Sequence, residues 1–315
     1  FYRHIIQALC RNGYEVHFFD EHYATRFPLL NKILLKLPLN LKVLLQKKYI
    51  SSIFKSKKST CSRYDYVFII RGEYFSSAVI SILKSHTPSS EYILYQWDSA
   101  KNLNFFAEQI GCFDKVFTFD DLDAQCFDVK HKSLFFNSEH VANRSKKDSE
   151  FSVSFVGTHH SNRFSFIRKF LDSNPELKAN AVIRLFRPKT SFYRALVFNK
   201  KELEGASLSD FITYPVSEKK TLDILGNSEN ILDITQPGQV GLTLRTFEAL
   251  GLQKKLITTN LNVKAYDFYN PNNIFLIDEA NLAVATNFLQ GSYQPVCEEV
   301  LKKYYVDFWV QEFFS

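Results

Sequence analysis

Short runs of valine, isoleucine, leucine and phenylalanine recur along the chain, separated by segments whose apolar positions have helical spacing. The runs predict strands at 14–20, 64–72, 91–99, 113–120, 151–158, 181–186, 210–216, 229–235, 254–260 and 273–278. Helices are predicted at 1–12, 75–85, 101–110, 162–173, 191–204, 217–228, 242–252 and at the C-terminus. This alternation favours an α/β fold of parallel sheets covered by helices on both faces.

The length of 315 residues is about twice that of a typical domain of ~150 residues. A polar stretch at 138–150 lacks large apolar groups, so the interdomain linker is predicted there. The predicted domains are 1–140 and 141–315. Because βαβ units begin with a strand and this chain begins with a predicted helix, we expect the first strand to precede Phe1.

The composition is typical of a folded protein, with 45% hydrophobic and 23% charged residues. No apolar run is long enough to cross a membrane. The five cysteines lie far apart and form no zinc-ligand pattern, which favours reduced thiols and a cytoplasmic location.

The net charge of +6 comes from one segment. Residues 26–58 carry nine lysines and arginines, no acid, and many leucines, and they predict two short basic amphipathic helices. Two interpretations stay open. The segment could lie on an anionic membrane surface, or its leucines could face the core while its lysines face water. Nucleic acid fits less well, because the segment lacks interleaved aromatics.

Residues 233–260 contain the most informative pattern, a strand, a glycine-containing loop and a helix that begins near Leu242 or Thr243. Free N–H groups at a helix start bind anions, and Gly241 lets a diphosphate approach the backbone. Arg245 and Glu248 share a helix face, so one could neutralise phosphate while the other accepts hydrogen bonds from a ribose diol. The alternative is a surface ion pair of little energetic value.

The stretch RTFEALGLQKKLITTN resembles the donor-binding region of GT-B glycosyltransferases of the bacterial spore-maturation and polysaccharide-biosynthesis type. FVGT at 155–158 is similar to the first strand of their C-terminal domain, and YQWDS with FDKVFTFD to strands of their N-terminal domain. The resemblance implies two Rossmann-like domains that face each other across a cleft, with a C-terminal helix that packs back. The first glutamate of the E-x7-E pattern of retaining members falls on Val240, so the stereochemical outcome stays open.

The resemblance also implies site residues. Glu248 would hold the ribose, so Glu248→Ala is expected to abolish donor binding at a cost of less than ~1 kcal/mol in stability. Arg187, with Lys189, would face the leaving diphosphate, unless both are exposed loop charges. The donor-binding residues predicted in this way are Gly157, Thr158, Arg187, Gln239, Gly241, Leu242, Thr243, Arg245 and Glu248. His159 and His160 could bind donor or acceptor, or simply be solvated.

Carboxylates at strand ends are candidates for the base that deprotonates an acceptor hydroxyl. Asp98 follows one predicted strand, beside Trp97, which could stack on a sugar, and Glu73 follows another. The alternative for Asp98 is a helix cap. Asp120 and Asp121 are further candidates of the same kind.

Together the resemblance implies a metal-independent hexosyltransferase that moves a sugar from a nucleotide-diphosphate donor to a hydroxyl of a bacterial surface glycan, such as lipopolysaccharide O-antigen or capsule. It implies no cofactor beyond the donor substrate, an acceptor that could be lipid-linked, and a place in the cytoplasm or on the inner face of its membrane. Two alternatives stay open, a nucleotide-sugar epimerase and a non-catalytic glycan- or partner-binding protein.

Overall fold

The computed structural model describes residues 2–20, 36–56, 63–88, 90–144, 149–203, 205–236 and 238–315. The chain forms two compact units, each built from separate stretches of sequence. One unit comprises residues 13–133 and 313–315, and the other comprises residues 1–12 and 134–312. The predicted division into 1–140 and 141–315 therefore assigns both chain ends differently from these units.

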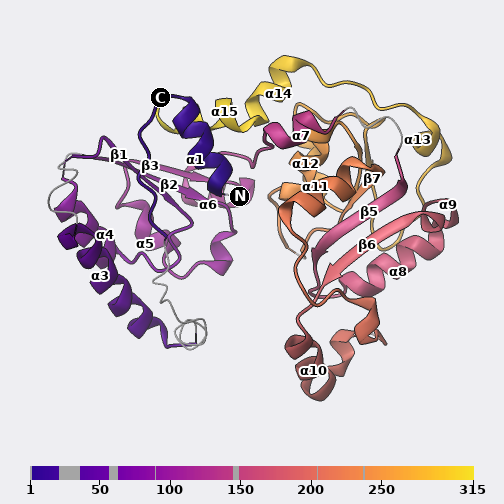
Figure 1. Ribbon diagram of the computed structural model, residues 1–315, viewed down its shortest axis with the longest axis horizontal. Helices are drawn as coiled ribbons and strands as arrows, with labels where there is room; N and C mark the ends of the chain where they lie inside the picture. The colour runs from indigo at the N-terminus through magenta and orange to yellow at the C-terminus, as the bar shows by residue number, and fades with distance from the viewer. Residues whose placement is uncertain are drawn as a thin grey trace. The chain divides into compact units, whose positions relative to one another are not determined.

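The unit of residues 13–133 and 313–315 contains a four-stranded parallel sheet in the order β1-β2-β3-β4 (Figure 1). Its strands are β1 (Tyr66–Ile70), β2 (Glu91–Gln96), β3 (Lys115–Thr118) and β4 (Lys130–His131). Its helices are α3 (Leu39–Ser56), α4 (Ser77–His86), η1 (Ala100–Asn102), α5 (Phe106–Ile110) and α6 (Asp121–Phe127). Consecutive parallel strands joined by helices are the arrangement that the sequence pattern predicts.

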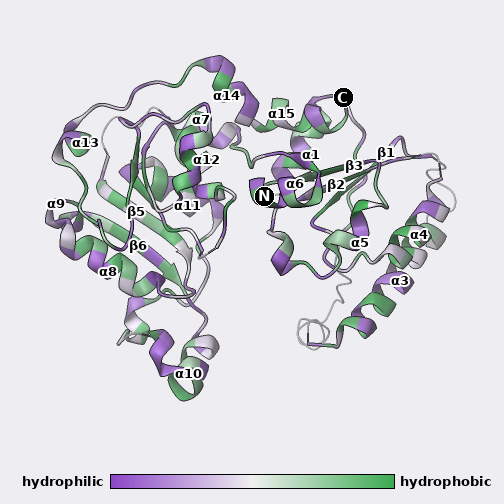
Figure 2. Cartoon of the chain, turned by 180° about the vertical axis from the view of Figure 1, so that it is seen from behind, coloured by the Kyte–Doolittle hydropathy of each residue, from purple (hydrophilic) through white to green (hydrophobic). Residues whose placement is uncertain are grey.

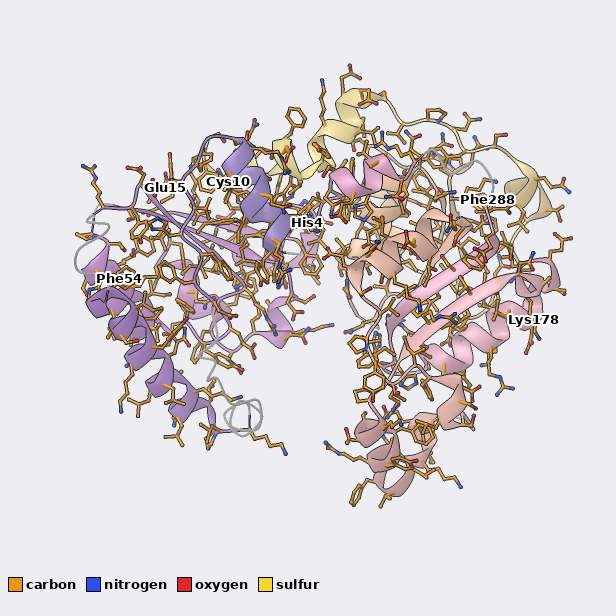
Figure 3. The ribbon with its side chains drawn as sticks, viewed as in Figure 1. His4, Cys10, Glu15, Phe54, Lys178 and Phe288 are labelled. Atoms are coloured by element: carbon orange, nitrogen blue, oxygen red, sulfur yellow. The ribbon has the colours of Figure 1, made fainter. Side chains whose placement is uncertain are left out.

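The two faces of this sheet are buried by different partners, because successive side chains of a strand point to opposite faces. Helices α3 and α4 pack on one face, where Phe54 of α3 (Figure 3) also stacks on His86. Phe313 packs on the other face, with its ring centroid 4.9 Å from that of Phe68 and 4.7 Å from that of Phe117. The last three residues therefore complete the core of a unit that otherwise ends at Ser133.

The unit of residues 1–12 and 134–312 contains a five-stranded parallel sheet in the order β6-β5-β7-β8-β9. Its strands are β5 (Phe151–Thr158), β6 (Ala181–Phe186), β7 (Ser228–Asp233), β8 (Lys255–Thr258) and β9 (Ile274–Leu276). Its helices are α1 (Tyr2–Arg11), α7 (Ser138–Ala142), α8 (Arg163–Ser173), α9 (Pro175–Ala179), α10 (Lys189–Phe198), η2 (Lys200–Leu203), η3 (Leu208–Asp210), α11 (Glu218–Gly226), α12 (Leu244–Leu252), η4 (Leu261–Ala265), α13 (Thr286–Gln290), α14 (Glu298–Tyr304), α15 (Val306–Trp309) and η5 (Val310–Phe313), whose last residue belongs to the other unit. In Figure 1, α8 covers one face of this sheet, while α11 and α12 cover the other.

Close packing explains one glycine of this unit. A Cβ on Gly251 of α12 would lie 2.7 Å from the Cβ of Phe136 and 2.9 Å from that of His140, which belongs to α7. Because only glycine leaves room for this approach, α7 and α12 lie in direct contact. Phe136 in turn forms an isolated bridge with Tyr305, so the C-terminal segment packs against the same region.

Three predictions about local structure are wrong. Residues 14–20 and 210–216 form no strand, and only Ile212 makes an isolated bridge, to Phe186. The predicted linker at 138–150 begins with α7, and Asn137 caps this helix. The Asn137 side chain accepts from the N–H groups of Glu139 and His140, and the Asn137 N–H donates to Nδ1 of His140. A short polar sequence with a capping box forms a packed helix here, because the cap satisfies its end groups.

The basic segment 26–58 is described only in part. Residues 26–35, 57 and 58 lie outside the described residues, and α3 covers most of the rest. Within α3, Ile50 is buried, whereas Leu41 and Leu44 are exposed. In the part of the chain that the structure describes, no helix combines the length and the hydropathy that crossing a bilayer requires.

Candidate functional site

The order of strands in the five-stranded sheet creates a topological switch point. The chain leaves β5 to form β6 on one side and later returns to form β7 on the other side of β5. In open parallel sheets, loops that diverge in this way leave a crevice at the carboxyl ends of the two strands, where ligands bind. Here those ends are Thr158 and Asp233, so the predicted FVGT strand end and the predicted 233–260 region belong to one site.

Arg163, the first residue of α8, joins the two strand ends. Its guanidinium donates to the carbonyl oxygen of Thr158 at 2.7 Å and to that of Ile234. Burial lowers the pKa of Arg163 to about 10, which leaves the side chain charged at neutral pH. Next to it, a Cβ on Gly157 would lie 2.9 Å from the ring of Phe155, so the glycine permits close packing at this strand end.

The loop before α12 is held by amide side chains. Asn260 donates from Nδ2 to the carbonyls of Val240 at 3.2 Å and Gly241 at 3.3 Å, and the amide of Gln239 donates to the Gly241 carbonyl at 3.0 Å. The Leu242 side chain is buried in the core, so it anchors the loop, and only the Leu242 backbone is left for a ligand contact. Gln239 and Gly241 therefore have a structural role in shaping the turn.

Helix α12 begins without a side-chain cap. Thr243 is the N-cap residue, but its hydroxyl makes no capping bond and instead donates to Asp233 Oδ2 at 2.9 Å. Helix starts carry backbone N–H groups that no helical carbonyl can satisfy, together with partial positive charge. The start of α12 thus lacks a side-chain cap, which is the feature that the predicted anion site requires.

The carboxylate of Asp233 holds the start of α12 through hydrogen bonds. Its Oδ2 accepts hydrogen bonds from three hydroxyls, those of Thr243, Thr246 at 3.2 Å and Thr258 at 3.4 Å. Burial raises the pKa of Asp233 and outweighs the Thr243 hydrogen bond and the charges of Arg245 and Arg163, which lower it. A buried carboxylate thus ties the end of β7 to α12 and β8.

The raised pKa of Asp233 predicts the direction in which the stability of the protein changes with pH. A carboxyl group can have a higher pKa in the folded state than its value of ~3.9 in the unfolded state. Such a group stabilises the folded protein fully at pH values below ~3.9, and this contribution is lost as the pH rises through the folded-state pKa. We therefore expect Asp233→Asn to remove a fall in stability that the parent shows as pH rises above about 4. Thermal unfolding of both proteins across this range measures it. Parallel profiles would show that Asp233 does not titrate there.

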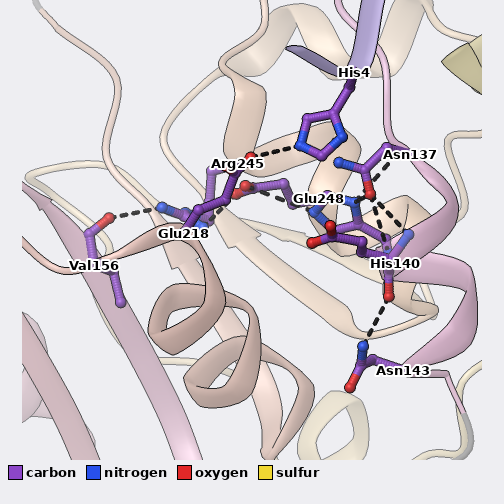
Figure 4. A network of polar contacts seen from close by, with 9 residues as sticks. His4, Asn137, His140, Asn143, Val156, Glu218, Arg245 and Glu248 are labelled. Carbon is purple, nitrogen blue, oxygen red and sulfur yellow. Dashed lines mark hydrogen bonds and ion pairs between the residues drawn. The ribbon is translucent and has the colours of Figure 1, made fainter. Parts of the chain in front are cut away.

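Arg245 and Glu248 form the centre of a buried polar network (Figure 4). Arg245 pairs with Glu248 and donates to the Val156 carbonyl at 2.8 Å. On the other side of Glu248, Nε2 of His140 lies 3.7 Å from Oε1. Only 13% of the Glu248 side chain is exposed. Burial opposes ionisation, but Arg245 and His140 together outweigh it and hold the pKa of Glu248 below its ordinary value.

This environment changes two expectations. Arg245 and Glu248 are not a surface pair, because each has further partners and little exposure. The expected cost of less than ~1 kcal/mol for Glu248→Ala is also too small, since removing one partner leaves Arg245 with an uncompensated charge.

Arg187 is neither an exposed charge nor a free cation. The Arg187 side chain is 3% exposed, pairs with Glu202 at 3.0 Å and contacts Nδ1 of His159 at 2.6 Å. Its charge is therefore largely neutralised within the unit, whereas Lys189 at the start of α10 is exposed. Burial and the charge of Arg163 lower the pKa of His160 to about 4, so this imidazole is neutral at physiological pH.

In the other unit, candidate carboxylates meet at the ends of β1 and β2. The Arg71 guanidinium lies 3.2 Å from Glu73 and 3.8 Å from Asp98. Arg71 has a φ of 71°, unusual for a residue with a side chain, and buried glutamines hold this turn, since Gln96 donates to the Arg71 carbonyl at 2.7 Å. The fold thus imposes backbone strain to bring one cation between two predicted base candidates.

The remaining candidates have visible structural roles. Asp98 Oδ1 accepts from the Ser99 N–H at 3.0 Å and from Asn102 Nδ2 at 2.8 Å, so it also stabilises the turn that starts η1. Asp120 is buried and caps α6 through Leu122 and Asp123, which accounts for its place at a strand end. Asp121 lies 3.3 Å from His131.

Four site residues were not predicted from the sequence. Asp233 and Asn260 carry a readable signal, a polar residue at or just after the end of a buried strand, whereas Arg163 is the first residue of a helix. His140 lies in the stretch predicted as a linker, and only the fold brings it to Glu248.

Within the described ranges, no group of three or more histidines, cysteines and carboxylates is placed to hold a metal. Metal independence itself stays a prediction.

In sequence, the chain matches no protein family and no curated protein. Its structure is similar to several solved structures of GT-B proteins. A glycosyltransferase from Rickettsia africae has a TM-score of 0.53 at 10% identity over 98% of this chain and 85% of that one. An α,α-trehalose 6-phosphate synthase from Burkholderia multivorans has a TM-score of 0.51 at 11% identity over 85% and 74%. A UDP-GlcNAc 2-epimerase from Methanocaldococcus jannaschii has a TM-score of 0.51 at 13% identity over 93% and 90%.

These similarities confirm the predicted fold. The chain has the α/β fold of GT-B proteins, with two parallel sheets of four and five strands. The identities are low and the names include both transferases and an epimerase, so the similarity shows the fold and leaves the reaction to be argued from the site.

Proposed function

We propose that the protein is a metal-independent glycosyltransferase that takes a sugar from a nucleotide-diphosphate donor. The observation that carries the proposal is the meeting of an uncapped α12 start with the buried Arg245–Glu248 pair at the switch point of the five-stranded sheet. The start of α12 suits a diphosphate, and the Arg245–Glu248 pair suits a ribose diol. Both belong to the first turns of the same helix.

The donor would be held mainly by backbone and by Glu248. The diphosphate would accept hydrogen bonds from the first N–H groups of α12, whose partial charge also stabilises the leaving group as it departs. Glu248 would accept from the ribose hydroxyls, and the lowered pKa keeps it an acceptor. Gly157 and Thr158 would lie beside the diphosphate at the end of β5.

The acceptor hydroxyl would lose its proton to Asp98 or Glu73, both near Arg71. A hexose as the transferred sugar, and a bacterial surface glycan such as O-antigen or capsule as the acceptor, are part of the proposal. Val240 occupies the position of one glutamate of the retaining pattern, so the stereochemistry is not part of it.

A lipid-linked acceptor would bring the enzyme to the inner membrane face, and the basic segment 26–58 is proposed to contact that surface. The exposed residues of α3, which makes up most of the described part of this segment, support contact with a membrane surface. Leu41 and Leu44 of α3 are exposed, and Lys48 on the same helix face is exposed as well. Ile50 and Phe54, in contrast, pack in the core, as the alternative interpretation expects.

An epimerase is the second candidate, because the fold is shared with the UDP-GlcNAc 2-epimerase. The two reactions are separable. An epimerase converts its nucleotide sugar without any acceptor, whereas a transferase releases nucleoside diphosphate only as the sugar is transferred or hydrolysed.

We expect one nucleotide sugar of a panel carrying UDP, GDP, TDP or CMP to raise the unfolding temperature. At a ligand concentration 100 times the Kd, binding adds ~2.7 kcal/mol of stability. The matching free nucleotide and a free sugar serve as controls. A flat response across the panel would contradict both the transferase and the epimerase, and would favour a non-catalytic binding protein.

A further inference from the structure

Helix α10 exposes an unusual amount of apolar surface. Of the thirteen large apolar side chains that the described residues expose, four lie within residues 193–198. Tyr193 is 55% exposed, Leu196 44%, Val197 73% and Phe198 82%. Scattered single residues of this kind are normal, but a contiguous group marks an interaction surface.

The opposite face of α10 anchors the helix. Phe192 and Ala195 are buried in the core cluster of their unit, and the Phe192 ring packs against Phe211 with centroids 5.9 Å apart. The three-residue spacing of these two positions places them on one helix face, with Val197 opposite and Tyr193, Leu196 and Phe198 on the flanks. Figure 1 shows that α10 projects beyond the end of β6, and Figure 2 shows hydrophobic positions along it.

The charges of α10 and of the start of η2 have one sign. Residues 188–201 contain four basic side chains and no acid, and all four are exposed: Lys189, Arg194, Lys200 and Lys201. The next residue, Glu202, pairs with the buried Arg187 and accepts from Asn199, so its charge is engaged within the unit. The segment therefore exposes apolar and cationic side chains together.

We propose that α10 and the start of η2 dock the protein on an anionic lipid bilayer. Aromatic and aliphatic side chains on a projecting helix enter the boundary between headgroups and acyl chains, and each flanking lysine or arginine near an anionic surface adds attraction. A second copy of the chain fits less well, because a two-fold interface would bring the four cations against four more.

The position of α10 after β6 places the exposed residues of α10 at one edge of the five-stranded sheet. Helix α10 follows the carboxyl end of β6, the edge of the sheet at which β5 and β7 also end. Docking by α10 would hold this edge near the lipid surface. That docking would help the protein reach a lipid-linked acceptor rests on the proposed function. The docking proposal itself does not depend on that function.

The test is sedimentation of the full chain with vesicles of phosphatidylcholine alone or of phosphatidylcholine with phosphatidylglycerol. We expect binding to the anionic vesicles only, with release as salt shortens the Debye length from ~30 Å at 0.01 M to ~10 Å at 0.1 M. The double variant Val197→Ser, Phe198→Ser should bind at least ~10-fold more weakly, because two large apolar side chains no longer enter the lipid. Lys200→Gln with Lys201→Gln should weaken binding and reduce its salt dependence.

Matched variants separate α10 from other surfaces. Leu261→Ser changes another exposed apolar residue of the same unit and should bind as the parent does. Leu41→Ser with Leu44→Ser tests α3 in the same assay. Unfolding temperatures verify that each variant is folded. Equal sedimentation of parent and the Val197, Phe198 variant would overturn the proposal, as would a parent that stays in the supernatant at low salt. A parent dimer that the variant converts to monomer, without lipid binding, would overturn it in favour of self-association.

Discussion

Replacing Glu248 by alanine is expected to lower the free energy of unfolding by ~3–5 kcal/mol, which is the usual cost of leaving one partner of a buried ion pair uncompensated. Arg245 would keep its bond to the Val156 carbonyl but lose its carboxylate, and His140 would lose its acidic neighbour. Denaturant unfolding of the parent and the variant measures the loss. A change below ~1 kcal/mol would show that solvent, rather than Glu248, balances the charge of Arg245.

A second variant separates stability from donor binding. Changing both residues, Arg245→Met with Glu248→Leu, removes both charges and should recover much of the stability, because apolar residues of similar size often replace buried pairs without loss. The same protein should no longer bind the nucleotide sugar found in the panel. Binding as tight as in the parent would remove Glu248 and Arg245 from the donor site and leave only their structural role.

Asp98→Asn is expected to bind donor normally and to lose roughly 10²-fold in turnover. Asparagine keeps an oxygen that can accept from the Ser99 N–H and the Asn102 amide, so the turn should survive the change. What it removes is the basicity needed to take a proton from the acceptor hydroxyl. The measurement is kcat under saturating donor, with the melting temperature as the check on folding.

The control for this variant is Asp121→Asn, the same chemical change at the end of β3, where the carboxylate pairs with His131. It should leave kcat within a factor of a few. If Asp98→Asn also keeps most of its turnover, Asp98 is a turn residue and Glu73 becomes the candidate base. Asp120 does not become a candidate base, because its side chain is buried and caps α6.

The strands that could be predicted from the sequence are those whose apolar run is long and ends in a turn. FSVSFVGT and ENILDIT became β5 and β7 within one or two residues. Residues 14–20 have a similar alternation but form no strand, because alternation describes side-chain burial and not the presence of a pairing partner. Residues 210–216 contain Pro215, which cannot donate to a ladder, and only Ile212 makes a bridge.

The candidate site was predictable in its outline but not in its contacts. The glycine loop and the R-x-x-E helix are local patterns, so their positions follow from the sequence. The pairing of Arg187 with Glu202 and the approach of His140 to Glu248 depend on tertiary packing. The sequence alone therefore carries no sign that Arg187 is buried and paired or that Glu248 is buried.

The chain passes from one unit to the other three times, at 12/13, 133/134 and 312/313. A single cut anywhere between residues 13 and 312 therefore yields no piece that carries a whole unit. Residues 134–312 alone lack α1, whose Ile5 and Ala8 are buried, and residues 13–133 alone lack Phe313. Split reporters and domain swaps on this scaffold would need the N-terminal helix to be grafted back onto one half and the last aromatic residues onto the other.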